Sequence, residues 1–465
     1  MLRTHNCGQL KAADIGKEVT LCGWVGSRRD HGKLIFIDVR DRYGLTQVVF
    51  IPKESAGAYT KAQDLRSEFV IKVTGKVNPR PKGTVNLKLA TGEVEILATK
   101  LEIINPSLTP PFEITDDLDI TEDLRLKYRY LDLRRTSVFN NFVMRHKLYQ
   151  IIRAFLNKNE FIECETPILT KSTPEGARDY LVPSRVNPGQ FYALPQSPQL
   201  FKQILMVAGI DRYYQIAKCF RDEDLRADRQ PEFTQLDIEM SFVQEEDIFS
   251  LTEGLYQAIF KELKGIDLPI PFPRMAYAQA QKEFNCDKPD LRQKLNLEYA
   301  FVWVIDFPLF KYNDEEKRWE SEHHPFTSPR QEDLELLDKA PEKVLSRSYD
   351  LVLNGSELGS GSIRIHDQKL QEKIFNIIGI SQEEARKRFG FLLEAFEFGA
   401  PVHGGVAFGM DRLLTILANQ SSIREVIAFP KTQKAFCPLT NAPSQVDEKQ
   451  LNELNIAVKP IKRRE

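Results

Sequence analysis

The chain has 465 residues, of which 42% are hydrophobic and 28% are charged, and its formal net charge is −2. These values predict an ordinary globular protein with two or three domains, and the lack of any run near about 18 apolar residues excludes a membrane-spanning helix. Lys and Arg total 64 against 66 Asp and Glu, so a polyanionic partner would have to be met by local basic patches.

The amino terminus and the cysteines favour a cytoplasmic location. The first ten residues, MLRTHNCGQL, lack the apolar segment of a signal peptide. The six cysteines are scattered without a CxxC pair, which argues against a structural zinc site and against a disulfide framework. We therefore expect reduced cysteines that serve in packing.

Residues 1–104 read as a series of short strands. The alternating runs are KEVTLCGWV, KLIFIDVRD, LTQVVFI, FVIKVTGKV, TVNLKLA and GEVEILA, with glycine-containing turns between them. About five or six such strands in this length fit a small Greek-key barrel of the OB type.

Several residues of this segment suit single-stranded nucleic acid. Arg28 and Arg29, expected in the first loop, could hold phosphates, and Gln47 on the third strand could read a base edge. Phe36 on the second strand could stack a base, although it could equally belong to the barrel core. The alternation alone leaves both readings of Phe36 open.

A linker is expected at residues 105–136. NPSLTPP is a proline-rich break that predicts a hinge, and DLDITEDLRLKYRYLDLRR predicts a short helical segment whose basic residues could be salt-bridged on the surface. Apolar residues then recur at helical spacing from about Ser137 to Lys158. The strand that follows stops at Pro167, which predicts an edge or an interface, because proline cannot extend a central ladder.

The stretch from Tyr214 to Phe242 predicts a hairpin with a highly charged loop. Two alternating runs, YQIAKCF and EFTQLDIEMSF, flank the loop. Arg221 and Glu223 would share one face of the hairpin, where a planar guanidinium can bind phosphate oxygens and a carboxylate can accept from an amine or a hydroxyl. A solvated charged loop is the alternative.

Three motifs in order resemble the signatures of class II aminoacyl-tRNA synthetases. The helix and strand closed by Pro167 resemble the first signature, which forms the dimer interface in that class. The sequence Phe220-Arg221-Asp222-Glu223 resembles the second, and GGVAFGMDRLLTIL, residues 404–417, resembles the third. Together with the barrel in front of them, these motifs are a specific signal.

Further stretches are similar to bacterial-type aspartyl-tRNA synthetases over nearly the whole chain. They are TPEGARDY, LPQSPQLFKQ, HHPFTSP, NGSELGSGSIRIHD and IAFPKT. The resemblance implies an α+β protein, in which an OB-fold anticodon-binding domain precedes a catalytic domain, residues 137–465, built on an antiparallel sheet flanked by helices. It also implies an inserted domain of roughly 100 residues after CDKPDLR, where this chain has only QKLNLEYAF before VWVIDFPLF.

The chemistry expected of such an enzyme is the attack of an aspartate carboxylate on the α-phosphate of ATP. Arg221 is suited to binding the α-phosphate, and Arg412 is suited to binding the terminal phosphates and to lying against one face of adenine. Phe233 could stack on the other face of adenine. Hard oxygen ligands for Mg²⁺ would come from Asp350 and Glu357. The further ATP-binding residues implied by the resemblance are Asp222, Glu223, Gln230, Gly409, Met410 and Asp411, and Arg221, Glu223 and Arg412 are the expected catalytic residues.

The resemblance also implies a site for the amino acid. Its expected residues are Arg364, Lys202, His323, His324, Arg221, Ser197 and Gln199, with Asp237 and Glu175 toward the substrate ammonium. A buried bidentate arginine would reject asparagine, because an amide leaves donors unpaired. A metal site at the histidine pair lacks a third ligand at suitable spacing, and the glycines Gly359, Gly361, Gly404, Gly405 and Gly409 suggest close backbone approach to a ligand.

In this family a histidine at the position of His31 accompanies relaxed anticodon reading, which suggests that tRNA(Asn) is charged as well as tRNA(Asp). The expected partners are therefore these tRNAs, ATP, L-aspartate and a second copy of the chain. An asparaginyl-tRNA synthetase and a synthetase-like RNA-binding protein without catalysis are the alternatives.

Overall fold

The computed structural model describes residues 1–117, 119–173, 177–225 and 228–459. It divides into two compact units, Met1–Phe139 and Asn140–Glu465. Within the described ranges, no helix combines the length and apolar character needed to cross a membrane. Glu175, an expected aspartate-binding residue, lies outside these ranges.

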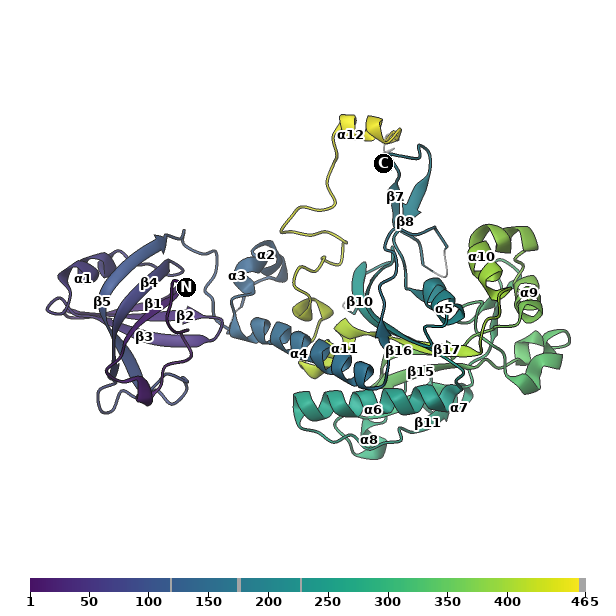
Figure 1. The fold of residues 1–465 in the computed structure, drawn as a ribbon, viewed down its shortest axis with the longest axis horizontal. Helices are drawn as coiled ribbons and strands as arrows, with labels where there is room; N and C mark the ends of the chain where they lie inside the picture. The colour runs from purple at the N-terminus through teal and green to yellow at the C-terminus, as the bar shows by residue number, and fades with distance from the viewer. Residues whose placement is uncertain (118, 174–176, 226–227, 460–465) are drawn as a thin grey trace. The chain divides into compact units, whose positions relative to one another are not determined.

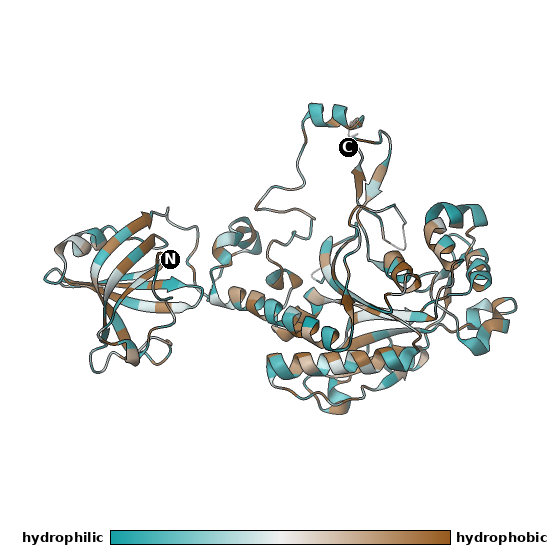
Figure 2. Cartoon of the chain, in the orientation of Figure 1, coloured by the Kyte–Doolittle hydropathy of each residue, from teal (hydrophilic) through white to brown (hydrophobic). Residues whose placement is uncertain are grey.

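The first unit contains a closed five-stranded barrel, counted over the residues that the structure describes, with strand order β1-β2-β3-β5-β4. Its strands are β1 (Glu18–His31), β2 (Leu34–Asp41), β3 (Gly44–Phe50), β4 (Val70–Pro79) and β5 (Val94–Asn105). Alternate residues such as Val19, Leu21, Ile35 and Ile37 fill its interior, and apolar and polar positions alternate along the strands in Figure 2. This confirms the predicted OB-type barrel.

Two details of the barrel differ from the sequence prediction. Residues 84–90 form turns instead of a strand, since the backbone N–H of Asn86 donates locally to Gly92, the N–H of Leu89 donates to Asn86, and Leu87 is 91% exposed. Arg28 and Arg29 do not lie in a loop, because β1 continues to His31 and pairs with β2 up to that residue. The short helices packed in this part of the chain are η1 (Ala12–Asp14) and α1 (Ala56–Gln63).

The linker residues form two short helices, α2 (Glu122–Lys127) and α3 (Arg129–Asp132). The arginines there are salt-bridged, as predicted: Arg125, Arg129 and Arg135 pair with Asp132, and Arg134 pairs with Glu68. Asp132 is fully buried and accepts hydrogen bonds from Arg129 and, at 2.8 Å, from Arg135. The buried Glu68 of the barrel accepts a hydrogen bond from Arg134 at 2.6 Å. These charge-assisted bonds tie the linker to the barrel inside the first unit.

The second unit is organised by an eight-stranded sheet, in the described part of the chain, with order β11-β12-β15-β16-β17-β10-β9-β6. Its strands are β6 (Ile162–Glu163), β9 (Arg212–Phe220), β10 (Glu232–Ser241), β11 (Arg274–Ala276), β12 (Phe301–Ile305), β15 (Ser348–Leu353), β16 (Ser356–Ile363) and β17 (His403–Gly409). The central pairs are antiparallel as predicted, whereas the pairs β6–β9 and β11–β12 at the two edges are parallel. The strand before Pro167 is thus an edge strand, and it is shorter than predicted.

One face of this sheet carries the main apolar core. The helices α4 (Thr136–Lys158), α6 (Glu245–Lys264) and α11 (Met410–Leu417) contribute to it, and α6 runs along the sheet in Figure 1. Within the core, Phe249 of α6 stacks on Trp303 of β12 with ring centroids 4.3 Å apart. Helix α5 (Gln199–Val207) packs against β9 and β10, and its Lys202 contacts a β10 carboxylate that faces away from this core.

The remaining elements surround the sheet. A second apolar cluster is built around Phe326, Phe375 and Phe389. The elements are β7 (Leu181–Pro183), β8 (Phe191–Ala193), α7 (Tyr277–Phe284), α8 (Arg292–Leu295), β13 (Phe310–Asn313), β14 (Arg318–Ser321), η2 (Gln331–Leu337), η3 (Pro341–Lys343), α9 (Gln368–Ile377), α10 (Gln382–Phe396), η4 (Ile423–Val426) and α12 (Glu448–Glu453).

Candidate active site

A cavity of about 580 Å³ lies in the second unit and is within the usual size of a small-molecule site. Most of the residues predicted from the sequence line it. They are Ser197, Gln199, Lys202, Arg221, Glu223, Gln230, Phe233, Asp237, His323, His324, Asp350, Glu357, Arg364, Gly409, Asp411 and Arg412. Asp222 and Met410 are not among the lining residues, and Met410 is buried in the apolar core.

The strand period of β10 explains how charged residues come to line this cavity. Leu236, Ile238 and Met240 point into the apolar core. The odd-numbered residues between them therefore face the other side of the sheet, where Asp237 lines the cavity. Glu239, two residues further on the same face, was missed by the sequence reasoning.

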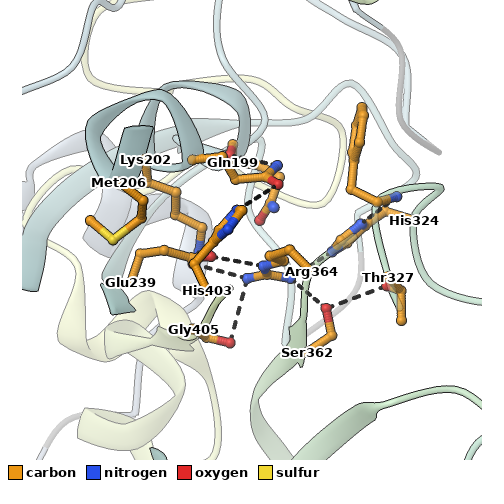
Figure 3. Close-up of polar contacts among 12 residues, drawn as sticks. Gln199, Lys202, Met206, Glu239, His324, Thr327, Ser362, Arg364, His403 and Gly405 are labelled. Carbon is orange, nitrogen blue, oxygen red and sulfur yellow. Dashed lines mark hydrogen bonds and ion pairs between the residues drawn. The ribbon is translucent and has the colours of Figure 1, made fainter. Parts of the chain in front are cut away.

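Glu239 contacts Lys202 and Arg364, the two buried cations that are expected to bind the amino acid. It is fully buried and accepts hydrogen bonds from Arg364 at 2.9 Å (Nε) and 3.1 Å (Nη2), as Figure 3 shows. The ammonium of Lys202 lies 3.1 Å from Glu239 and 2.8 Å from Asp237. Burial alone would raise the pKa of Glu239, but Arg364 and Lys202 lower it to about 2. Glu239 therefore stays ionised and fixes the guanidinium plane.

Asp237 has spare acceptor capacity toward the cavity. Both of its carboxylate oxygens are buried without a hydrogen bond, apart from the ion pair with Lys202. Burial raises its pKa, although Lys202 opposes that effect. A substrate ammonium in the cavity would supply the missing donors, as the resemblance implied for this residue.

His324 is hydrogen-bonded to Arg364. Burial lowers its pKa well below the usual value, with a further contribution from Arg364, so the ring is neutral. Its Nε2 lies 2.8 Å from Arg364 Nη1, and this short contact to a permanent donor makes Nε2 the acceptor. Arg364 Nη1 also donates to Ser362 Oγ at 2.7 Å. His324 and Arg364 therefore line the cavity as a hydrogen-bonded pair.

At the other end of the cavity, Arg221 lies over the ring of Phe233, with the guanidinium carbon 5.2 Å from the centroid. Its Nε is buried without a hydrogen-bond partner. Arg221 covers one face of the Phe233 ring, and the expected stacking of adenine on Phe233 stays a prediction. Glu223 accepts a hydrogen bond from Arg229 at 3.1 Å. Arg221 therefore has unused donor capacity for a ligand.

The residues of the third motif divide between ligand-facing and supporting positions. Arg412 donates to the backbone carbonyl of Glu357 and lies 3.6 Å from Asp228. Asp411 is buried, and its carboxylate is occupied by Arg145 and by the backbone N–H of Thr234 at 2.9 Å. Gln230 makes two hydrogen bonds with the backbone of Lys431, at 2.9 and 2.7 Å. In this structure Asp411 and Gln230 therefore support the walls of the cavity.

Two carboxylates next to Arg412 fit a divalent cation. Asp350 on β15 and Glu357 on β16 belong to one hairpin and both line the cavity. Asp350 Oδ1 is buried without a hydrogen bond, and His323 Nε2 lies 3.5 Å from it. Burial raises the pKa of Asp350. Within the described ranges no cluster has three protein ligands, so phosphate oxygens would have to complete the shell, as is usual for Mg²⁺.

The glycines of β16 and β17 allow close strand packing, and three of them, Gly359, Gly361 and Gly409, also line the cavity. A Cβ added to Gly361 would lie 2.2 Å from the carbonyl oxygen of Gly405. One added to Gly405 would lie 2.0 Å from the carbonyl oxygen of Ile238 and 2.1 Å from the carboxylate of Glu239. Neighbouring strands and Glu239 therefore fill the space that a larger side chain would need.

The expected anticodon residues lie on the outer surface of the barrel. Phe36 is half-buried between the buried Ile35 and Ile37, which excludes the reading of Phe36 as core. The ring of His31 packs edge-on against Phe36 at 5.7 Å. Arg28 pairs with Asp30 at 2.8 Å.

Gln47 belongs to a polar chain on the same barrel. It accepts a hydrogen bond from Arg29 at 3.2 Å and donates to Glu95 at 2.8 Å. Arg29 also bonds Asp38 through both terminal nitrogens, at 2.5 and 2.9 Å. The barrel therefore carries aromatic and polar groups side by side on strands β1 to β3.

Comparisons with known proteins agree with this architecture. The model of class II tRNA synthetases for D, K and N matches residues 121–433, and the model of OB-fold nucleic acid binding domains matches residues 19–104. An asparaginyl-tRNA synthetase from Pyrococcus horikoshii, complexed with asparaginyl-adenylate, has a TM-score of 0.75 at 24% identity, covering 93% of this chain and 99% of that one. An aspartyl-tRNA synthetase from Entamoeba histolytica has a TM-score of 0.74 at 22% identity, covering 92% and 91%. At these identities the structures show a shared fold.

Relatives found by sequence have a higher identity to this chain than these structures do. An "Aspartate--tRNA(Asp/Asn) ligase" of Desulfatibacillum aliphaticivorans is 46% identical, covering 99% of this chain and 98% of the relative. One of Syntrophomonas wolfei is 47% identical, covering 99% and 100%. The first alignment has 585 positions against 465 residues in this chain, so at least 120 positions hold no residue of it, which agrees with the missing inserted domain. The chain belongs to the class II aminoacyl-tRNA synthetases, in the family of aspartate–tRNA ligases.

Proposed function

We propose that the chain attaches L-aspartate to tRNA(Asp) with ATP, through an aspartyl-adenylate. An oxygen of the aspartate α-carboxylate attacks the α-phosphate, and the bond to the β-phosphate breaks so that pyrophosphate leaves. A terminal ribose hydroxyl of the tRNA then attacks the activated carbonyl, and AMP leaves. We expect the reaction in the cytoplasm, where charged tRNA is used.

The observation that carries the choice of aspartate is the buried guanidinium of Arg364 in the wall of the cavity, hydrogen-bonded to His324 at 2.8 Å. A side-chain carboxylate can pair with this cation through its charge as well as through hydrogen bonds, whereas the amide of asparagine carries no charge. Lys202 is nearby and adds a further positive charge. A buried mismatch of this kind supports strong discrimination.

The protein's own residues account for binding and charge stabilisation. Asp237 would hold the substrate ammonium, and Arg221 would bind the α-phosphate as charge develops there. Arg412 would bind the terminal phosphates. Asp350 and Glu357 would hold Mg²⁺, which supplies positive charge to the phosphates when it is bound. Positioning and charge stabilisation suffice for this type of transfer, and the proposal requires no covalent nucleophile.

Amino-acid-dependent ATP–pyrophosphate exchange tests the proposal. We expect exchange with aspartate and Mg²⁺ and little with asparagine, and a loss of more than about 100-fold in Arg221→Ala, since a charge contact at the α-phosphate is removed. Phe36→Ala is the matched control, because Phe36 belongs to the barrel, and it should keep near-normal exchange. Exchange with asparagine alone would favour an asparaginyl enzyme, and no exchange with either amino acid would favour a binding protein without catalysis.

We further propose that the enzyme charges tRNA(Asn) as well as tRNA(Asp). This rests on His31, which lies on the barrel surface against Phe36, and on relatives named for both tRNAs. Charging of the two purified tRNAs tests it. A preference of several hundredfold for tRNA(Asp) would refute it.

A homodimer is proposed for the second unit. Ile162 on the edge strand β6, and Ile168 and Leu169 after it, are each about half exposed. Exposed apolar residues grouped along an edge strand are costly in a monomer and suit a second copy of the same chain. Sedimentation equilibrium of the wild type and of Ile168→Asp measures this. A monomeric wild type at micromolar concentration would contradict the proposal.

A further inference from the structure

Residues 285–300 include CDKPDLR and most of the stretch QKLNLEYAF that stands in place of the expected inserted domain, and this segment reaches the proposed metal site. Leu291 is buried and belongs to the same apolar cluster as Met275 and Ala300, which fixes the segment to the edge of the sheet. The segment also docks on the turn between β15 and β16, where Asn354 bonds the backbone of Ala300 at 2.8 Å and the carbonyl of Glu298 at 3.0 Å.

This docking brings a lysine to one of the two carboxylates. Lys288 lines the cavity, and its ammonium lies 3.0 Å from Glu357 Oε2. Glu357 follows the docked turn directly in β16, so the segment and the carboxylate are held in register. Sequence reasoning did not assign Lys288 a role, because nothing in CDKPDLR indicates which group its side chain would meet.

Cations already contact Glu357 without a metal. The ammonium of Lys288 is in direct contact with its carboxylate, and Arg412 donates to its backbone carbonyl. A divalent cation that arrives alone must displace the ammonium from Glu357. A cation that arrives on a polyphosphate brings its own negative charge and most of its oxygen ligands.

We propose that Lys288 competes with the divalent cation for Glu357, so that the metal enters together with ATP and not by itself. The proposal deepens the proposed function, on which it rests. Lys288 is a positioning residue: its ammonium holds the Glu357 carboxylate in place in the nucleotide-free enzyme, and it leaves that oxygen when the metal–polyphosphate complex binds. Its side chain is 42% exposed, so it has room to move away.

Mn²⁺ binding to the full-length, nucleotide-free protein, measured by electron paramagnetic resonance, tests the inference without a catalytic readout. Lys288→Gln should bind Mn²⁺ about tenfold more tightly than the wild type, because a unit positive charge next to a divalent ion is removed. The double variant Lys288→Gln/Glu357→Gln should lose that gain. Lys294→Gln is the matched control, since Lys294 lies in the same segment but pairs with Glu283, at 3.2 Å, and its Mn²⁺ affinity should equal that of the wild type.

Equal Mn²⁺ affinity in Lys288→Gln and the wild type would overturn the inference, as would a gain that persists in the double variant. Aspartate-dependent exchange by the wild type is measured in parallel and distinguishes the two failures. If the wild type shows normal exchange but Lys288→Gln has the Mn²⁺ affinity of the wild type, only the role of Lys288 is refuted. If the wild type shows no exchange, the proposed function is refuted, and the assignment of Glu357 is refuted with it.

Discussion

Replacing Glu239 by glutamine tests the most specific part of the site. The four charged groups of the amino-acid end, Lys202, Arg364, Asp237 and Glu239, sum to zero, and the change leaves a net positive charge in a buried cluster. Glutamine can accept from Arg364 with its one oxygen only, and its amide nitrogen would oppose the second guanidinium nitrogen, which lies 3.1 Å from the present carboxylate. We therefore expect Arg364 to lose its fixed orientation.

The magnitude follows from the contacts that are lost. Truncating one partner of a buried, hydrogen-bonded charge pair costs about 2–5 kcal/mol, and about 1.4 kcal/mol is a factor of ten. At the lower bound, kcat/KM for aspartate in ATP–pyrophosphate exchange should fall about 30-fold for Glu239→Gln. The loss should appear mainly in the KM for aspartate, because Arg364 binds the substrate before the phosphate chemistry. The KM for ATP should change little.

Glu253→Gln is a matched control for the general effect of losing a buried carboxylate. Glu253 is 3% exposed and accepts hydrogen bonds from Arg274 at 2.6 Å and Trp303 at 3.1 Å, outside the cavity. Both variants should melt at lower temperature, but only Glu239→Gln should raise the KM for aspartate. A KM within twofold of the wild type for Glu239→Gln, or an equal rise in Glu253→Gln, would refute the reasoning.

Three further outcomes are expected. In the first unit, Glu68→Gln should lower the free energy of unfolding by about 3 kcal/mol, because the buried Glu68 accepts hydrogen bonds from Arg40 at 2.6–2.8 Å; urea unfolding followed by Trp24 fluorescence measures it. Asp350→Asn should reduce exchange by at least about 100-fold and yet melt no lower than the wild type, because it removes a buried charge whose Oδ1 has no hydrogen bond. Burial lowers the pKa of His403, so the unfolded chain binds the proton more tightly than the folded chain does. The free energy of unfolding should therefore fall as the pH drops below about 6.5. Chemical denaturation at two pH values should show a weaker pH dependence in His403→Gln than in the wild type.

The strand periods made much of the fold predictable. The alternation of apolar and polar residues in the two runs around the charged loop predicted the pairing of β9 with β10. Asp237 of β10 lines the cavity. Alternation alone left both readings of Phe36 open, and only the burial of Ile35 and Ile37 in the structure places Phe36 on the outer face of the barrel. The run at residues 84–90 misled for a physical reason: it alternates, but it has no neighbouring strand to pair with, and its backbone bonds locally.

Long-range pairings could not be read from the chain. Glu239 is two residues from Asp237, so its face was predictable, but its buried partner Arg364 is 125 residues away. Without that partner a buried glutamate would be too costly to propose. The contact between Lys288 and Glu357 has the same origin, since it depends on how residues 285–300 dock on a hairpin that follows much later in the sequence.

These pairings share one electrostatic design. The two buried cations expected to bind the amino acid are each held by one of the protein's own carboxylates, Lys202 by Asp237 and Arg364 by Glu239. A buried lysine or arginine without such a partner would be strongly destabilising. The internal carboxylates keep the cations charged and oriented before the substrates arrive, so little reorganisation is needed when they bind. It follows that variants of the carboxylates should impair recognition by misplacing the cations, even where the carboxylates do not touch the substrate.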